Sequence, residues 1–237
     1  MLEFIKRQLP IGYLNYYRFL KNLFATNGFK SERLPGIFDE IIQTNYWKGS
    51  DSICGATSGV AATSELRTEL QQLFTNLNIR SVLDIPCGDF VWMKEMDLSA
   101  VQYTGADIVQ TMVDDNNRRY AAPNIHFECL DLTHSDLPRV DLVLCRDCLV
   151  HLSFEHIRQA ILNLKKSGST WLLCTSFVEN RFNYDIKDGL WRTLNMQKAP
   201  FCFPNPVKTM IDNRLLEDSV FSDKTLCLWR LDDIKIP

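Results

Sequence analysis

The feature that most constrains this 237-residue chain is a short apolar run that ends in an acid and a glycine turn, Ser81–Asp89. Its first five residues have strand character, and Pro86–Gly88 follows as a tight turn. Asp89 stands where a helix N-cap is expected, which predicts a helix over 90–96. A strand, a glycine turn and a helix form the first βα unit of a nucleotide-binding sheet.

The residues around this turn separate two kinds of ligand. Only Gly88 is present where the dinucleotide fingerprint needs three glycines. Asp84 and Asp89 flank the turn, so a pyrophosphate placed here would meet two carboxylates, whereas a cationic ligand would be attracted. The pattern therefore favours a cationic cofactor over a nicotinamide dinucleotide.

Composition bounds the class of protein. A length of 237 residues fits one large domain, or one domain with appendages. A content of 46% hydrophobic and 23% charged residues is typical of a globular protein. The net charge is −3 and no run of Lys and Arg exceeds two residues, so no nucleic-acid partner is expected. No signal peptide and no apolar run of the ~20 residues that a transmembrane helix needs are found, which predicts a cytoplasmic protein. The sequence does not indicate an oligomeric state.

The eight cysteines are scattered through predicted strands, as free thiols of a reducing cytoplasm are. Cys145, Cys148 and His151 have a spacing that resembles a metal site, but no second CxxC pair completes four ligands. We therefore expect no metal.

From Ile79 onward strands and helices alternate, which predicts a parallel sheet covered on both faces. The last two strands are separated by only about a dozen residues, which favours an antiparallel hairpin at the sheet edge. The expected fold is a Rossmann-like, doubly wound, seven-stranded α/β sheet, mostly parallel, in a domain over 61–237 with an N-terminal helical cap over 1–60. The predicted strands span 81–85, 101–106, 124–130, 140–145, 170–177, 206–211 and 224–231, and the predicted helices span 11–25, 37–46, 63–77, 108–120 and 154–165.

Carboxylates stand at the ends of three successive predicted strands, as Asp84, Asp107 and Asp131. Ligands of an open parallel sheet bind over the carboxyl ends of its strands, so we expect these acids along one rim. Asp107 follows Asp84 by 23 residues, close to the spacing at which an acid binds ribose hydroxyls. Asp131 has an alternative interpretation as a turn residue, because Thr133 and Ser135 follow it.

Residues 79–231 resemble the class I S-adenosylmethionine-dependent methyltransferases. Leu83–Asp89 is similar to their first motif, Gly105–Asp107 to the acid after their second strand, and Leu130–Leu132 to their adenine-side motif. Asp141–Asp147 is similar to their fourth strand, and the antiparallel terminal hairpin to their distinctive sheet edge.

The resemblance implies S-adenosyl-L-methionine as the cofactor. Asp84 and the turn after it would face the methionine part, Asp107 would bind both ribose hydroxyls, and Asp131 would accept from the adenine amino group. The residues that the resemblance assigns to cofactor binding are Asp84, Pro86, Cys87, Gly88, Asp89, Asp107, Ile108, Asp131, Leu132, Cys145 and Arg146.

Methyl transfer to a hydroxyl group needs alignment, exclusion of water and a general base, and it needs no metal. Asp147 and His151, at and just after the end of the fourth strand, are the catalytic candidates. An equally good interpretation of His151 is a buried residue that supports its loop. Arg146 has an alternative interpretation as the partner of Asp147 in an internal ion pair. Tyr46, Trp47 and the loop over 54–59 are expected to close over the cofactor.

The 178–204 connection is the expected acceptor-binding segment, because long ordered loops at this edge of a sheet carry specificity. Two of its aromatic residues, Trp191 and Phe201, could equally anchor the loop to the core. The expected acceptor contacts are Asn183, Asp185, Trp191, Arg192 and Asn195.

The leading hypothesis is transfer of a methyl group from S-adenosylmethionine to a small-molecule or glycan acceptor by in-line displacement. One alternative is a non-catalytic interaction module that retains the fold. A nicotinamide-dependent oxidoreductase ranks lower, because the phosphate-binding glycines are missing. Nucleic-acid methylation is disfavoured by the acidic balance and by Cys145–Cys148, which stands in place of an Asn/Asp-Pro-Pro-aromatic motif.

Overall fold

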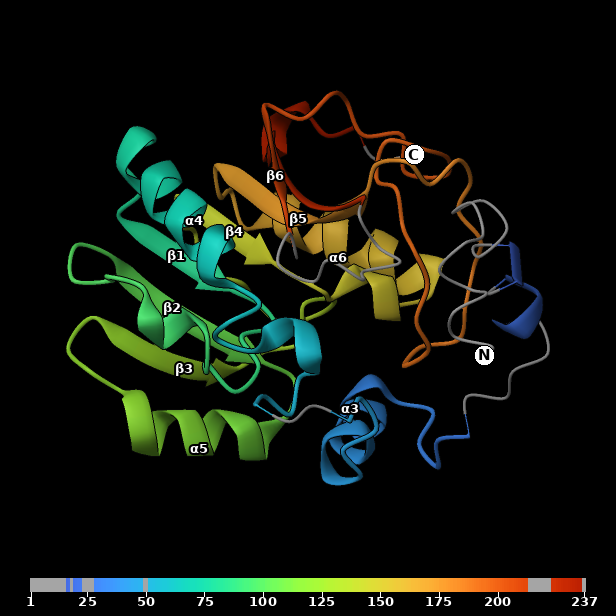
Figure 1. Ribbon diagram of the computed structural model, residues 1–237, viewed down its shortest axis with the longest axis horizontal. Coiled ribbons are helices and arrows are strands. Elements are labelled where there is room, and N and C mark those ends of the chain that lie inside the picture. The colour runs from blue at the N-terminus through green and yellow to red at the C-terminus, as the bar shows by residue number, and fades with distance from the viewer. Residues whose placement is uncertain (1–15, 18, 23–27, 49–50, 213–222, 236–237) are drawn as a thin grey trace.

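The computed structural model describes residues 16–17, 19–22, 28–48, 51–212 and 223–235 (Figure 1). The predicted helix over 11–25 lies largely outside these residues. Within the described ranges, no helix has both the length and the apolar character needed to cross a membrane.

The described strands form one seven-stranded sheet in the order β3-β2-β1-β4-β5-β7-β6. Neighbours from β3 through β5 are parallel, whereas β7 is antiparallel to both β5 and β6. The terminal hairpin therefore inserts β7 beside β5 and leaves β6 at the edge, which confirms the predicted sheet. The strands are β1 Ser81–Asp84, β2 Gln102–Asp107, β3 Ile125–Cys129, β4 Leu142–Cys145, β5 Trp171–Phe177, β6 Lys208–Ile211 and β7 Lys224–Arg230.

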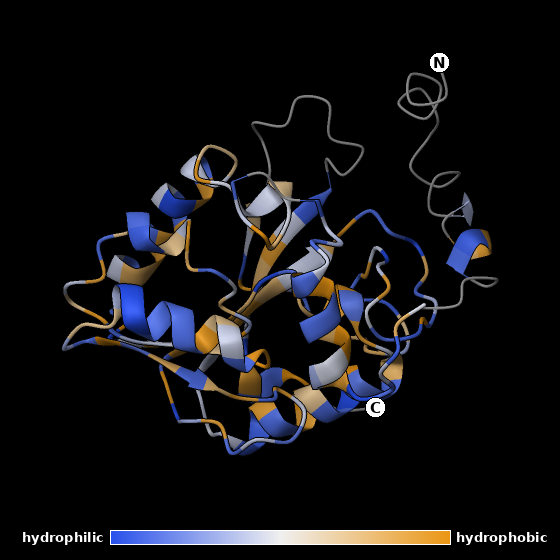
Figure 2. Ribbon diagram, turned by 90° about the horizontal axis from the view of Figure 1, so that it is seen from below, coloured by the Kyte–Doolittle hydropathy of each residue, from blue (hydrophilic) through white to orange (hydrophobic). Residues whose placement is uncertain are grey.

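Alternate residues along the central strands supply two separate cores. Leu83 and Val143 belong to the core that contains α6, whereas Val82 and Leu142 belong to the core that contains α4 and part of α5. Strands buried on both faces are expected in a parallel sheet covered by helices, and Figure 2 shows hydrophilic and hydrophobic segments alternating along those helices. The helices are α3 Leu34–Gln43, α4 Ser64–Asn76, α5 Gln110–Tyr120 and α6 Phe154–Lys166.

The helix expected after the first turn does not form. Residues 90–101, all of them described, contain only a 3-10 turn, η2 Met93–Glu95. Phe90 has a φ of 57°, and its buried ring packs on Tyr103 and Phe127 with centroids 5.2 and 5.0 Å away. A left-handed residue directly after the turn prevents a helix from starting there. The predicted helix and its N-cap were therefore wrong.

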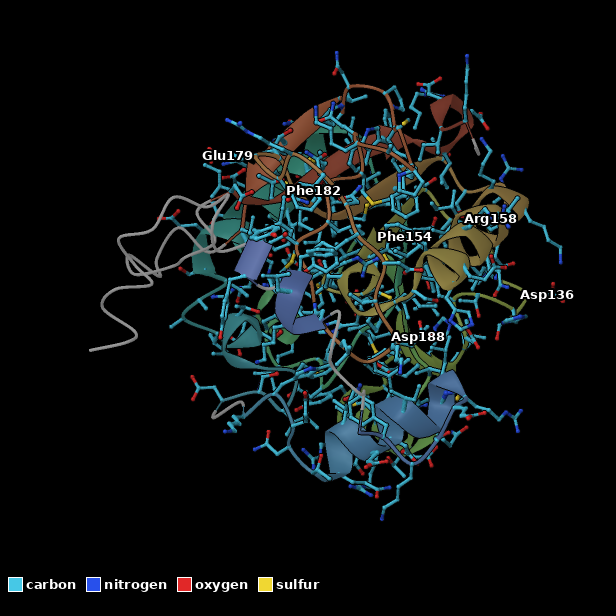
Figure 3. All side chains as sticks on the ribbon, turned by 90° about the vertical axis from the view of Figure 1, so that its right-hand side faces the viewer. Asp136, Phe154, Arg158, Glu179, Phe182 and Asp188 are labelled. Carbon is cyan, nitrogen blue, oxygen red and sulfur yellow. The ribbon has the colours of Figure 1, made fainter. Side chains whose placement is uncertain are left out.

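The connection between β5 and β6 packs on the same face of the sheet as α6. Leu194 and Met196 are fully buried in that core, and Phe201 meets Phe154 edge to face at 5.3 Å. Asp188 accepts a hydrogen bond from the backbone N–H of Ser153 at 2.7 Å. Figure 3, in which Phe154 and Asp188 are labelled, shows the connection crossing the start of α6.

Candidate active site

A cavity with about 1030 Å³ of empty space, part of it open to solvent, lies over the carboxyl ends of β1, β2 and β4. Open α/β sheets bind their ligands at this position, and Figure 1 shows α3 at the end of the sheet toward which the parallel strands point. All predicted cofactor and catalytic residues except Cys145 line the cavity. Those lining residues are Asp84, Pro86, Cys87, Gly88, Asp89, Asp107, Ile108, Asp131, Leu132, Arg146, Asp147 and His151.

Gly88 gives the first turn its close approach to the cavity. Its φ is 55°, and a Cβ placed on it would lie 2.5 Å from Sγ of Cys54. The backbone N–H of Cys87 donates to the carbonyl of Ala106 at 2.8 Å, and the Asn116 amide donates to the carbonyl of Gly88 at 2.7 Å. The turn is thus fixed to β2 and α5, and a side chain at this glycine would be strained and would displace Cys54.

Asp107, at the end of β2, is 6% exposed and faces the cavity with both oxygens oriented by backbone N–H groups. Gly88 donates to Oδ2 at 3.2 Å and Val109 donates to Oδ1 at 3.0 Å. Burial raises the pKa of Asp107 to about 6, although these backbone hydrogen bonds lower it. Each carboxylate oxygen retains acceptor capacity, so a neighbouring pair of hydroxyls could donate one hydrogen bond to each.

Asp84, at the end of β1, lies deeper and has a partner that the sequence analysis missed. The hydroxyl of Tyr103 donates to its Oδ2 at 2.6 Å. Burial raises the pKa of Asp84 to about 7, while the Tyr103 hydroxyl and the Arg146 charge lower it. The floor of the cavity therefore holds a carboxyl group that keeps its proton to a higher pH than an ordinary aspartate does.

Asp89 fixes a loop over the turn instead of capping a helix. It accepts hydrogen bonds from the Ser52 hydroxyl and the Ile53 backbone N–H, both at 3.0 Å. The loop that follows supplies Cys54 and Ser58 to the lining of the cavity.

Asp131 lies at the cavity and also shapes its own turn. Its Oδ1 accepts from the backbone N–H of Thr133 at 2.8 Å, which is the turn geometry considered as its alternative role. Leu132, next along the chain, is buried beside the cavity. Asp131 therefore both stabilises its turn and lines the cavity.

Arg146 and Asp147 belong to a buried network of four charges. Arg146 donates from Nε and Nη2 to the two oxygens of Asp212, at 2.9 and 3.0 Å. Lys224 Nζ lies 2.6 Å from Asp147 Oδ2 and 3.0 Å from Asp212 Oδ2. Arg146 Nη2 also donates to the carbonyl of Thr57 at 2.8 Å, so the network joins the end of β4 to the terminal hairpin and the cavity loop. Asp212 and Lys224 were missed because they are 66 and 77 residues from their partners and stand in no motif.

The network decides which catalytic candidate can act as a base. Burial raises the pKa of Asp147, but the charges of Lys224 and Arg146 outweigh that effect and lower the pKa to about 2. A carboxylate held ionised by two cations has little tendency to take a proton at neutral pH.

His151, in contrast, is neutral and oriented. Its Nδ1 lies 3.0 Å from the carbonyl of Leu190, and because a carbonyl only accepts, Nδ1 carries the proton and Nε2 keeps its lone pair. Burial lowers the pKa of His151 to about 4. The indole of Trp47 packs on the imidazole with ring centroids 5.0 Å apart. His151 thus supports its loop, and because its pKa stays above that of Asp147 it is the stronger base of the two candidates that line the cavity.

None of the five predicted acceptor residues lines the cavity. Asn183 and Asn195 hold the connection together, because the Asn183 amide donates to the Asn195 carbonyl at 2.8 Å and accepts from its N–H at 2.9 Å. Asp185 accepts from the backbone N–H of Phe154 at 2.7 Å, at the start of α6.

The other two predicted acceptor residues pack against the core. Trp191 meets Phe177 edge to face at 5.8 Å. Arg192 is fully buried, with its guanidinium 5.3 Å from the ring centroid of Phe154 and Nη1 donating to the carbonyl of Val150 at 3.2 Å. Contact of these five residues with an acceptor stays a prediction.

Two further observations concern cysteines and metals. Cys145 is fully buried in the core that contains α6, away from the cavity lining that Cys148 joins. In the part of the chain that the structure describes, no three His, Cys, Asp or Glu side chains are grouped to hold a metal ion.

The cavity has an apolar wall from α3 to which the sequence analysis assigned no role. Leu34, Phe38 and Ile42 recur every four residues along one side of the helix, and Trp47 follows after the turn. The Phe38 and Trp47 ring centroids are 6.5 Å apart. The four-residue spacing was the available signal, but a stripe of this kind packs into a core more often than it lines a site.

The sheet is parallel except for one antiparallel strand next to its edge, and strand-end acids and a glycine turn meet at one cavity. This arrangement is typical of nucleotide-binding α/β proteins. Residues 82–167 match the family model described as a methyltransferase domain. Comparison with curated protein sequences found no significant match.

Solved structures of methyltransferases share the fold. The 1,6-didemethyltoxoflavin-N1-methyltransferase of Burkholderia thailandensis is 14% identical, with a TM-score of 0.61 over 82% of this chain and 87% of that chain. An S-adenosylmethionine-dependent methyltransferase of Leishmania major is 13% identical, with a TM-score of 0.63 over 90% and 89%. The magnesium protoporphyrin IX methyltransferase of Synechocystis PCC 6803 is 12% identical, with a TM-score of 0.56 over 82% and 98%. Over residues 82–167 the chain is thus similar to a methyltransferase domain, and its fold is the one that these S-adenosylmethionine-dependent methyltransferases share.

Proposed function

We propose that this protein transfers a methyl group from S-adenosylmethionine to a small-molecule or glycan acceptor. The observation that carries the proposal is one cavity that combines three strand-end acids, Asp84, Asp107 and Asp131, with the Gly88 turn and the neutral imidazole of His151. In this proposal residues 61–237 bind the cofactor and the acceptor, and residues 1–60 cap the cavity.

The residues present fit this cofactor. The two buried oxygens of Asp107 suit paired ribose hydroxyls, and the acidic lining suits a sulfonium cation. The structures of the Burkholderia and Synechocystis relatives contain S-adenosylhomocysteine, which supports the assignment. When bound, S-adenosylmethionine supplies an electrophilic methyl group: the acceptor atom forms the new bond to carbon, and sulfur keeps the electron pair of the broken carbon–sulfur bond.

The chain's own residues would then position the acceptor and remove its proton. Nε2 of His151 accepts the proton, while the Leu190 carbonyl holds the ring in the required tautomer. The ionised Asp147 nearby favours the imidazolium that forms. Trp47 and the side of α3 that faces the cavity exclude water from the reacting atoms.

The course of the chain after β1 argues against the oxidoreductase alternative. A dinucleotide pyrophosphate binds at the N-terminus of the helix that follows the glycine turn. Residues 90–101 form no α-helix. Asp89 lies in the turn, and its carboxylate accepts hydrogen bonds from Ser52 and Ile53 of the neighbouring loop.

The experiment that tests the proposal combines binding with transfer. S-adenosylhomocysteine at ~100 times its dissociation constant should stabilise the protein by roughly 2.7 kcal/mol and raise its melting temperature, whereas NADH should not. Incubation with methyl-tritiated S-adenosylmethionine and a panel of hydroxylated and amino compounds should then move the label to an acceptor. Stabilisation without transfer to any acceptor would favour the non-catalytic alternative, and stabilisation by NADH alone would refute the proposal.

A further inference from the structure

The part of the cavity next to His151 is built from aromatic rings. The Trp47 indole lies 5.0 Å from the His151 imidazole, tilted by 39°, and Phe38 lies 6.5 Å beyond it. Phe38 and Trp47 are only partly buried, so the cavity leaves part of each side chain uncovered. Aromatic pairs are most favourable with centroids about 4.5–7 Å apart. A flat aromatic ring could therefore pack against Trp47 and Phe38 and direct its substituent at His151.

The charges of the described lining residues disfavour an acceptor that carries a phosphate. Among the described lining residues Arg146 is the one Lys or Arg side chain. Its guanidinium already donates hydrogen bonds to Asp212 and to the carbonyl of Thr57. The lining also carries five aspartates, which are Asp84, Asp89, Asp107, Asp131 and Asp147. Among the described lining residues a phosphate on the acceptor would find no free cation and would be repelled by these aspartates, whereas the carboxylate of the cofactor carries its own ammonium group beside it.

We propose that the acceptor is an uncharged aromatic hydroxyl compound, a phenol, whose ring packs against Trp47 and Phe38 and whose hydroxyl donates to Nε2 of His151. This inference rests on the proposed methyl transfer and narrows it, because sugar phosphates and other anionic glycans are excluded. A phenol also suits the available base: its hydroxyl has a pKa near 10, as in tyrosine, and is far more acidic than a sugar hydroxyl.

Binding measurements test the inference without requiring turnover. The full-length protein, saturated with S-adenosylhomocysteine, is titrated in a calorimeter with 2-naphthol, 2-naphthyl phosphate and methyl α-glucoside. We expect 2-naphthol to bind at least tenfold more tightly than the other two probes. Trp47→Ala and Phe38→Ala should each weaken 2-naphthol binding at least tenfold. The control is Phe182→Ala, an aromatic residue that is 45% exposed outside the cavity and is labelled in Figure 3; it should leave 2-naphthol binding unchanged.

The outcomes separate the two proposals. If S-adenosylhomocysteine does not bind, the proposed function fails and the inference fails with it. If it binds but 2-naphthyl phosphate or the glucoside binds as tightly as 2-naphthol, the methyltransferase proposal stands and the phenol inference is refuted. Unchanged 2-naphthol affinity in both aromatic variants, with S-adenosylhomocysteine affinity also unchanged, would equally overturn it.

Discussion

Replacing Asp212 with asparagine tests how the cavity is held together. Asp212 is 1% exposed and accepts hydrogen bonds from Arg146 while pairing with Lys224. With Asp147 the network contains two cations and two anions, so Asp212→Asn leaves one buried positive charge uncompensated. Removing one partner of a buried ion pair costs about 3–5 kcal/mol of folding free energy. For a chain of this size that corresponds to a fall in melting temperature of roughly 6–20 °C.

The measurement is urea denaturation of wild type, Asp212→Asn, Lys224→Met and the double variant. The double variant restores charge balance, because Arg146 still faces Asp147 at 3.6 Å. It should therefore be more stable than the sum of the two single losses predicts. The matched control is Asp136→Asn, which breaks a pair with Lys166 on the surface and should leave the midpoint unchanged. Strictly additive losses, or an Asp212→Asn variant as stable as the control, would refute this account of the network.

Three further perturbations have defined outcomes. Gly88→Ala should lower S-adenosylhomocysteine affinity in titration calorimetry, because the new Cβ meets Cys54 and a left-handed alanine costs about 1–2 kcal/mol; unchanged affinity would contradict the close approach of the turn. The raised pKa of Asp84, about 7, means that the folded state keeps a proton that the unfolded state loses above about pH 4. The free energy of unfolding should therefore decline as pH rises from about 4 to 7. In wild type this decline should be steeper than in Asp84→Asn, by up to about 1.4 kcal/mol per pH unit. Equal pH slopes of the unfolding free energy in the two proteins, measured by denaturation at each pH, would contradict this prediction. His151→Asn should slow methylation of 2-naphthol by roughly 10²–10⁴-fold with S-adenosylhomocysteine affinity retained, whereas equal losses of both would assign the residue a structural role.

The sequence predicted the sheet and its rim because both depend on local patterns. Continuous apolar strands separated by amphipathic helices specify a parallel sheet, and an acid at the end of a strand reaches the carboxyl edge whatever the loops do. Asp84, Asp107 and Asp131 therefore lie at one cavity. The helix after the turn failed for an equally physical reason, because burial of the Phe90 ring outweighs the helix-cap preference of Asp89.

The remaining features of the site depend on contacts between distant parts of the chain. Nothing local indicates that Lys224 will pair with Asp147, or that Tyr103 will donate to Asp84 from within a strand. We predicted the acceptor contacts in the 178–204 connection because it is a long loop that carries polar residues. The structure shows instead that the apolar side of α3 lines the cavity. Periodicity shows that such a side is apolar but not whether it contacts a core or a ligand.

The central claim is that this cavity binds the S-adenosyl group through Asp107. Isothermal titration of S-adenosylhomocysteine into wild type, Asp107→Asn and Asp114→Asn tests it most directly, since Asp114 is an exposed acid of α5 that does not line the cavity. Hydrogen bonds to a charged group contribute about 1.5–3 kcal/mol each, so Asp107→Asn should weaken binding roughly 100-fold with an unchanged circular dichroism spectrum. Asp114→Asn should bind as wild type does. Equal affinity in all three proteins would contradict the account.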